Sequence, residues 1–422
     1  MKTLIRPGIL VWKPSAEPLA NTPILIDDGV VAAIGDDAEH AVDGSTATID
    51  CPEQTLAPGL IDCHVHLVWS GRGDDLQGRN PLYAAIGMPP AAMAAQVITN
   101  MQAALASGVT TVRDCGGIAE VILPIAQAVR SGEVVGPRIL SSGAPITTTG
   151  GHCWFLENEA EGVDLVRQAV RRMHKAGADF IKVMATGGAT LGSNPRAAQF
   201  SQSELDAIAA DAHRLALPVS GHAHGTEGIE RVVAAGFDTI EHCSWQRLED
   251  GVDDYRPSVV ERIIEQRIFV CKTIAGFQRW PLEELEAAGQ AHDAWQSYAT
   301  FRDMVAAGVP IVAGTDAGIT DTNFVHLNRT METMVGLGGM TPASVLASAT
   351  ETAAEALRLE AEVGSLEVGK RADCILLHGN PLEDVRALRE PEMVMRDGVI
   401  VARGGGVRVA GAAVDPASMA VR

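Results

Sequence analysis

Histidine and aspartate side chains gather at the ends of short apolar runs in this sequence. The first of these runs ends in His64-Val65-His66. Side chains alternate between the two faces of a β-strand, so both imidazoles point to one face, as a shared metal ion requires. A lone His-Val-His is a weak signal, because many histidines are structural. Its place at the end of an apolar run favours a metal site.

Three later runs end in the same way, and together with the first they hold five of the 12 histidines. Their terminal side chains are His222 and His224, then His242, then Asp316. Any one of them read alone is more often structural than a ligand. A single shared site explains all of them more simply than separate structural roles. Imidazole and carboxylate ligands with room for water suit zinc, and also manganese, cobalt or iron.

Lys182 interrupts another apolar run, FIKVMATGG. A structural lysine would extend to the rim of the fold or pair with a carboxylate. If the shared site holds two metal ions, a positively charged ammonium on Lys182 would be repelled by them. Reaction with carbon dioxide would convert it into an anionic carbamate that bridges two metals. The sequence does not show this modification, and we predict it because only the anionic form suits a bridge between two cations.

Eight apolar runs alternate with helical segments between residues 57 and 364. This alternation of strands and helices is typical of a parallel sheet with crossover helices and predicts a (β/α)₈ TIM barrel. The active site of such a barrel lies at the carboxyl ends of the strands. An open doubly wound sheet would need a Gly-rich phosphate loop after its first strand, and there is none. The runs are LIDCHVHL, TTVRD, RILSSG, FIKVMAT, PVSGHAH, DTIEHC, FVCKT and PIVAGTD.

Strand-and-turn sequence at both chain ends predicts a second domain. Residues 1–56 and 365–422 contain short apolar runs between Pro, Gly and Asp pairs. The simplest organisation is one small β-domain built from both ends, with the barrel of residues 57–364 inserted between them.

The bulk properties exclude several classes of protein. The chain has 422 residues, 46% hydrophobic and 20% charged, which is a globular balance. Its formal net charge of -20 disfavours nucleic-acid and anionic-membrane partners. The N-terminal segment lacks the apolar core of a secretion signal, and no run is long enough to span a bilayer. Seven cysteines without short spacings indicate buried thiols in a reducing compartment, so we expect a cytoplasmic protein.

The motifs together resemble the metal-dependent amidohydrolase superfamily across nearly the whole chain. The matching segments are APGLIDCHVHL, TTVRDCGG, IKVMATGG, GHAHG, TIEHC, AGTDAG and GSLEVGKRADCILL. The resemblance implies a β-sandwich beside the barrel and two divalent ions, expected to be Zn²⁺. It assigns His64, His66 and Asp316 to the more buried ion, His222 and His242 to the more exposed one, and a carbamylated Lys182 to the bridge.

Two branches of the superfamily do not fit. Deaminases use one metal and carry a Glu three residues after the strand-five histidine, where this chain has Gly225. Non-catalytic members lack ligands, whereas this chain has all six. A non-catalytic metal-binding scaffold is therefore the remote alternative.

Within the superfamily, TTTGGHCWF around His152 resembles the dipeptidase-like branch. That branch includes Xaa-Pro and Xaa-Arg dipeptidases, ochratoxin amidohydrolases and phenylurea hydrolases, and the resemblance implies that His152 hydrogen-bonds the scissile carbonyl. A loop histidine packed under strand three is the structural alternative. Prolidase-like relatives often have Tyr where this chain has His224. We assign His224 as a second donor to the carbonyl oxygen.

These assignments predict cleavage of an amide C–N bond in a small, hydrophobic substrate through a metal-bridging hydroxide, with Asp316 moving the proton to the leaving nitrogen. Dipeptides, N-acyl amino acids and aryl amides fit. The alternative is a urea, carbamate or cyclic amide, as in phenylurea hydrolases or imidazolonepropionases.

Trp69, Trp154 and Trp245 follow strand ends and either form an apolar wall or pack outside. Arg113 and Arg196 either bind a substrate carboxylate or form structural ion pairs. The sequence is compatible with a homo-oligomer but does not fix the oligomeric state.

Overall fold

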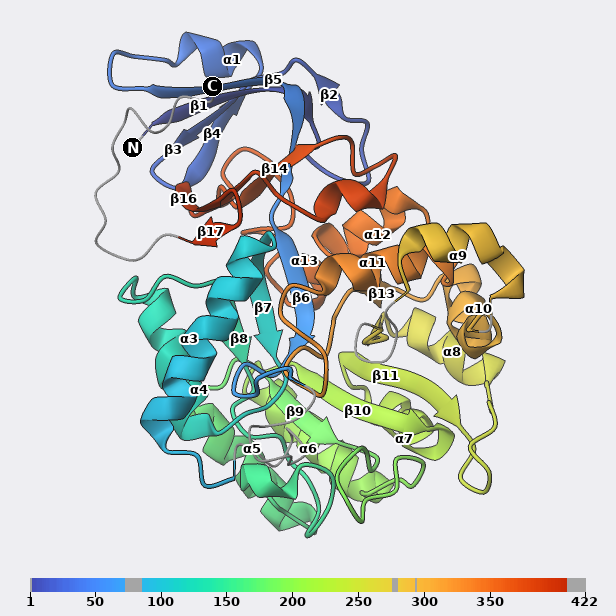
Figure 1. The fold of residues 1–422 in the computed structure, drawn as a ribbon. Helices are drawn as coiled ribbons and strands as arrows, with labels where there is room; N and C mark the ends of the chain where they lie inside the picture. The colour runs from blue at the N-terminus through green and yellow to red at the C-terminus, as the bar shows by residue number, and fades with distance from the viewer. Residues whose placement is uncertain (1, 73–85, 275–279, 293, 408–422) are drawn as a thin grey trace.

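The computed structural model describes residues 2–72, 86–274, 280–292 and 294–407. The chain is an α/β protein in which a sheet built from the chain ends lies beside a set of parallel strands covered by helices (Figure 1).

Both chain ends contribute strands to one nine-stranded sheet, blue and red in Figure 1. The two ends meet at β5, which pairs in parallel with β1 and antiparallel with β14. Apolar side chains such as Ile5, Leu56 and Leu376 alternate along the strands and form the buried hydrophobic core of this sheet. Its strands are β1 (Thr3–Leu10), β2 (Leu19–Ala20), β3 (Ile24–Asp27), β4 (Val30–Ile34), β5 (Ala47–Pro58), β14 (Cys374–His378), β15 (Met393–Arg396), β16 (Val399–Arg403) and β17 (Gly406–Val407).

Each of the eight apolar runs contains a strand, and these strands form two parallel sheets. The first sheet contains β6 (Leu60–Val65), β7 (Val109–Asp114) and β8 (Arg138–Ser141). The second contains β9 (Ile181–Met184), β10 (Val219–Gly225), β11 (Thr239–Gln246), β12 (Phe269–Cys271) and β13 (Ile311–Val312). All pairings within them are parallel, as the run pattern predicts.

Backbone contacts join the edges of the two parallel sheets on both sides. On one side a parallel bridge links Ile146, which follows β8, to Val183 of β9. On the other, Val65 of β6 bridges to Ala317, and the Asp316 amide donates to the carbonyl of His64 at 2.8 Å. The carboxyl ends of β6 and β13, far apart in the sequence, therefore lie side by side.

Amphipathic helices connect these strands, and three of them end at a glycine. Helices α5, α7 and α10 stop at Gly177, Gly236 and Gly308, each with a positive φ that glycine adopts without strain. A capping box of Ser201 and Glu204 begins α6. The helices are α1 (Asp36–His40), α3 (Pro90–Ala106), α4 (Ala119–Arg130), α5 (Val163–Ala176), α6 (Gln202–Arg214), α7 (Thr226–Ala235), α8 (Pro257–Glu265), α9 (Leu282–Ala288), α10 (Ala299–Ala307), α11 (Leu327–Gly336), α12 (Pro342–Ser348) and α13 (Glu351–Ala356).

Candidate active site

One cavity of about 170 Å³ lies at the carboxyl ends of the parallel strands. Every side chain that the sequence singled out as a ligand or carbonyl donor lines it: His64, His66, His152, Lys182, His222, His224, His242 and Asp316. Apart from the half-buried His224, these residues are buried. The segments that carry them come from six different parts of the chain, so the fold itself assembles the cluster.

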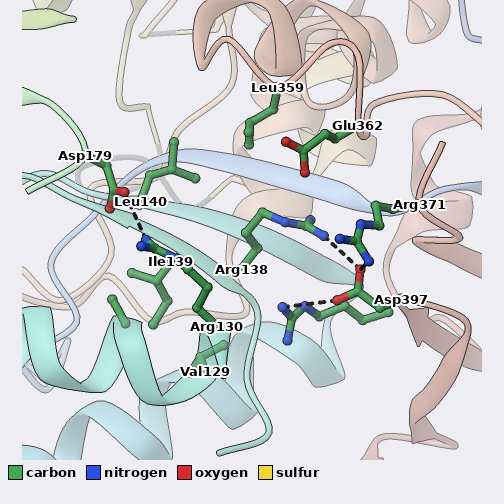
Figure 2. A pocket seen from close by; sticks show the side chains of 12 residues that line it. Val129, Arg130, Arg138, Ile139, Leu140, Asp179, Leu359, Glu362, Arg371 and Asp397 are labelled. Atoms are coloured by element: carbon green, nitrogen blue, oxygen red, sulfur yellow. Dashed lines mark hydrogen bonds and ion pairs between the residues drawn. The ribbon is translucent and has the colours of Figure 1, made fainter. Parts of the chain in front are cut away.

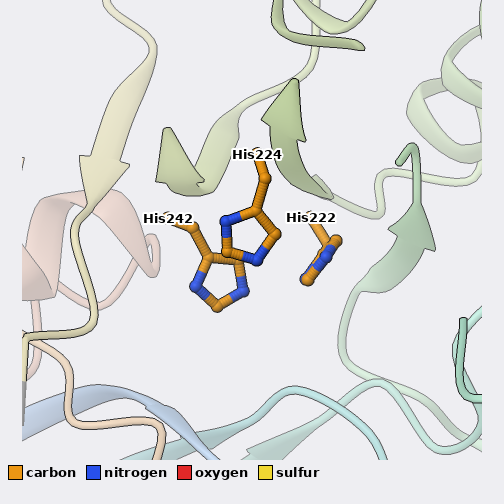
Figure 3. A group of neighbouring side chains, drawn as sticks. All are labelled: His222, His224 and His242. Atoms are coloured by element: carbon orange, nitrogen blue, oxygen red, sulfur yellow. The ribbon is translucent and has the colours of Figure 1, made fainter. Parts of the chain in front are cut away.

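The imidazoles and the carboxylate lie close enough to share ions. Asp316 Oδ1 lies 3.4 Å from His64 Nε2 and 3.2 Å from His66 Nε2. The ring centres of His222 and His242 are 4.4 Å apart, and His224 stacks on His242 at 4.5 Å (Figure 3). Among the side chains that line the cavity, donor atoms lie within 4.8 Å of one another in the groups His222–His224–His242 and His64–His242–Asp316. Three or four such donors are what a zinc site requires.

Hydrogen bonds fix the tautomers of four histidines. His64 Nδ1 lies 2.6 Å from Glu241 Oε2, and His66 Nδ1 lies 2.8 Å from the Gly116 carbonyl. These oxygens only accept, so both Nδ1 atoms carry the proton and both Nε2 lone pairs are free. His242 Nδ1 lies 2.6 Å from Thr273 Oγ1, whose own proton goes to the Lys272 carbonyl, so its Nε2 is free as well.

His222 has the opposite tautomer. Its Nε2 lies 3.0 Å from the Gly187 carbonyl and must donate, which leaves Nδ1 free. In metalloproteins a ligating histidine is held in this way, by a partner on its other nitrogen. The four histidines therefore fit metal ligation by their hydrogen bonding.

Burial lowers the pKa of five imidazoles in the cavity, those of His64, His152, His222, His224 and His242, and so favours their neutral forms. It lowers the pKa of His64 to about 4, with Lys182 contributing, and that of His152 to about 3, with His224 contributing. Burial and then His152 place the pKa of His222 well below its usual value. Burial alone would raise the pKa of Asp316, but the neighbouring His64 and His66 lower it. The cavity thus offers neutral nitrogens and an ionised carboxylate, the protonation states that bind metals.

Lys182 Nζ is buried and has no hydrogen-bond partner among the described residues. The Lys182 side chain is 1% exposed and lines the cavity. In the sequence it lies between the histidines at the end of β6 and those of β10. A buried ammonium without a partner is costly. This unpartnered atom, surrounded by histidines and Asp316, fits a lysine whose charge is changed by carbamylation.

Two ligand candidates have unusual backbones. His242 has φ 69° and Asp316 has φ 62°, in the left-handed region that non-glycine residues rarely adopt. At His242 the alternation along β11 is broken, so Glu241 reaches His64 and His242 still lines the cavity. Such strain collects at functional sites, where the surrounding fold holds it in place.

His152 lies in the cavity rather than under the strand. Its Nδ1 is 2.8 Å from Thr190 Oγ1, its backbone amide donates to Gln199 Oε1 at 2.7 Å, and its ring centre is 4.5 Å from that of His222. A Cβ on Gly188 would meet the imidazole at 2.4 Å, so glycine at this position makes room for the ring. His224 Nδ1 lies 3.0 Å from Ser244 Oγ.

The three tryptophans differ in their surroundings. Trp69 lines the cavity, and its ring centre lies 4.5 Å from that of His66. Trp154 is 41% exposed, and the buried Trp245 packs on Tyr255 and Met304. Only Trp69 of the three contributes to an apolar wall in this cavity.

Arg113 forms a buried ion pair at 2.6 Å with Glu241, a residue that the sequence reasoning missed. Glu241 also accepts from Ser220 and Thr239 and holds His64, so Arg113 acts through this network. Of the two arginines considered as carboxylate ligands, Arg113 is thus a structural partner. Arg196 does not line the cavity. Lys272, which directly follows β12 and lines an adjoining cavity, was not singled out from the sequence either, although a basic side chain just after a strand is a visible signal.

A larger cavity of about 360 Å³ lies at the amino end of β8 (Figure 2). Arg138 pairs there with Asp373 and Asp397, and Arg371 also pairs with Asp397. These ion pairs join the parallel strands to the terminal sheet. Most charged side chains of this cavity are already paired, so the histidine cavity is the candidate active site.

The described molecule is thus an α/β protein whose parallel strands present neutral imidazoles, a carboxylate and a buried lysine in one cavity. Residues 55–401 match the Amidohydrolase family. The chain is 31% identical to ochratoxinase of Aspergillus niger over 93% of this chain and 84% of that protein. It therefore belongs to the amidohydrolase family and is a hydrolase that acts on carbon–nitrogen bonds.

Other relatives agree with this membership. The chain is 26% identical to imidazolonepropionase of Agrobacterium fabrum (strain C58) over 84% of this chain and 83% of that protein. A crystal structure of a Xaa-Pro dipeptidase with bound methionine is similar with a TM-score of 0.82 and 29% identity, covering 96% of this chain and 100% of the other. Among the described helices, none is long and apolar enough to cross a membrane.

Proposed function

We propose that this protein is a binuclear metal-dependent hydrolase that cleaves the amide bond of a small, hydrophobic substrate such as a dipeptide, an N-acyl amino acid or an aryl amide. One observation carries the proposal: four histidines with fixed tautomers, an ionised Asp316 and a buried, unpartnered Lys182 line the same cavity. Burial of so many polar groups without bound ligands would be costly, and metal ions would offset that cost.

We divide the donor set between two ions as the resemblance to the superfamily implies. His64, His66 and Asp316 would hold one, and His222 and His242 the other. Lys182 Nζ would add to carbon dioxide, forming an N–C bond and releasing a proton, and the resulting carbamate would bridge the pair. Two divalent ions, expected to be zinc, would supply Lewis acidity toward water and the scissile carbonyl.

The chain's own residues would position the substrate and move protons. Asp316, whose pKa is lowered, would accept a proton from the attacking water and deliver it to the leaving nitrogen. His152 would donate a hydrogen bond to the carbonyl oxygen as negative charge develops there, with His224 as a second donor. Trp69 would cover the apolar part of the substrate and exclude water.

The fold that supports this site is proposed to be a closed (β/α)₈ barrel of residues 57–364. The bridges at Ile146–Val183 and Val65–Ala317 support closure, because they join both edges of the two parallel sheets. A β-sandwich domain of residues 1–56 and 365–422 would flank it, supported by the pairing of β5 with β14. The last 15 residues of that range lie outside the described residues. Cytoplasmic localisation and oligomeric state stay predictions from the sequence.

Hydrolysis of a urea, carbamate or cyclic amide is the second candidate, favoured by the similarity to imidazolonepropionase. A panel of N-acyl amino acids, dipeptides and arylureas, assayed before and after chelation and again after adding Zn²⁺, tests both candidates. We expect chelation to abolish turnover and Zn²⁺ to restore it. Turnover of arylureas alone would favour the second candidate, and full turnover by metal-free protein would overturn the proposal.

A further inference from the structure

A second cavity of about 210 Å³ adjoins the candidate active site. His224 and His242 line both cavities, and Figure 3 shows their rings stacked. The remaining lining side chains are mostly polar and come from the end of β11, from Asp253, from the segment just after β12 and from residues 297–300 around the start of α10.

Lys272 is the cation of this cavity. Its ammonium forms no hydrogen bond or ion pair with any residue in the described ranges, and burial lowers its pKa. Asp253, the acidic residue of the lining, is exposed and forms no ion pair with it. Lys272 is half-buried, and Cys243 and Asp253 oppose the effect of burial on its pKa without forming an ion pair with it. An anion entering the cavity would give this cation a direct partner.

Hydroxyl groups line the same cavity as Lys272. The hydroxyls of the buried Tyr298 and Thr300 have no hydrogen-bond partner in the described part of the chain. One cation with nearby hydroxyl donors matches one negative charge with two oxygens, which is a carboxylate. A phosphate dianion would leave a charge unpaired.

We propose that Lys272 binds a free carboxylate of the substrate, so that this enzyme acts on N-acyl amino acids or dipeptides rather than on neutral aryl amides or ureas. The inference rests on the proposed function. In both favoured substrate classes the carboxylate is attached to the carbon next to the scissile nitrogen. A substrate with its amide beside His224 and His242 would therefore direct this carboxylate into the adjoining cavity.

A matched substrate pair tests the inference. N-benzoyl-L-phenylalanine and N-(2-phenylethyl)benzamide differ only in the carboxylate. We expect wild-type protein to prefer the acid in kcat/KM, and Lys272→Met to lower kcat/KM for the acid by about 10- to 100-fold, mainly through KM, the range for losing a charged hydrogen bond. The neutral amide should be unaffected. Lys272→Arg should keep the preference, and Lys175→Met, at an exposed position on α5, is the control.

A binding measurement separates this inference from the proposed function. Calorimetry compares L-phenylalanine with 2-phenylethylamine, and zinc content is measured in parallel because Thr273 contacts His242. Carboxylate-dependent binding that Lys272→Met removes, with no turnover by wild type, would support the carboxylate site and overturn the proposed function. Turnover and binding indifferent to the carboxylate and to Lys272→Met would overturn the site and leave the function standing.

Discussion

Replacing Glu241 by Gln should weaken metal binding without removing a ligand. Glu241 is fully buried, and its Oε1 accepts from Arg113 at 2.6 Å and Ser220 at 2.8 Å, while Oε2 accepts from His64 Nδ1 at 2.6 Å. Glutamine has one acceptor and one donor group. If its oxygen faces Arg113, its NH₂ meets the proton on His64 Nδ1. His64 then has to change tautomer, which puts a proton on the Nε2 that faces Asp316.

The magnitude follows from these contacts. Loss of the partner that orients a ligating histidine typically costs about 10- to 100-fold in metal affinity. Removing one charge of a buried ion pair costs about 3–5 kcal/mol of stability, because the Arg113 charge loses its partner. We therefore expect Glu241→Gln to bind Zn²⁺ about 10- to 100-fold more weakly and to unfold at lower denaturant concentration.

Zn²⁺ affinity is measured by competition with a chelator, and the His64 tautomer by ¹⁵N NMR of the imidazoles. Glu332→Gln is the control, since Glu332 is also buried and pairs with Arg389 at 2.7 Å but contacts no histidine. It should lose stability and keep its affinity for Zn²⁺. A Glu241→Gln protein with wild-type affinity and an unchanged His64 tautomer would refute the reasoning.

Three further variants test the remaining roles. Lys182→Ala should be inactive with partial rescue by a short carboxylate, and a metal-loaded crystal structure should show density beyond Nζ; full activity in this variant would exclude the bridge. Asp316→Asn should keep the fold and lose most turnover, and near wild-type kcat with two ions bound would place the proton transfer elsewhere. His152→Ala should lower kcat by about 10²–10³ with unchanged metal content, whereas a rise in KM alone would indicate a role in ground-state binding.

The sequence predicted the members of the cavity because parallel strands bring their carboxyl ends together. Knowing that His222 and Asp316 each end an apolar run was enough to place them near His64, without any knowledge of the contacts between them. The eight runs therefore predicted both the strands and the residues that face the cavity.

The residues that hold the ligands could not be predicted in this way. Strict alternation along a strand would point Glu241 and His242 to opposite faces, and only the positive φ at His242 lets both serve the same site. Arg113 and Glu241 are 128 residues apart in the sequence, so their pairing depends on the tertiary fold. Local patterns do not report such contacts, which is why the role of Arg113 stayed open until the structure was known.

The neighbouring residues Lys272 and Thr273 serve two different parts of the site. Thr273 Oγ1 holds His242 in the tautomer that leaves Nε2 free, and the neighbouring Lys272 provides the unpaired charge of the adjoining cavity. A movement of this segment after β12 would change both the orientation of a proposed ligand and the position of the proposed carboxylate partner. An anionic substrate bound to Lys272 would restrict the movement of this segment and so hold the His242 ring in its orientation. A neutral substrate would not contact Lys272 in this way and would leave the segment free to move. Zn²⁺ affinity should accordingly rise when L-phenylalanine is present and stay constant with 2-phenylethylamine. An equal effect of the two compounds would show that the two tasks are independent.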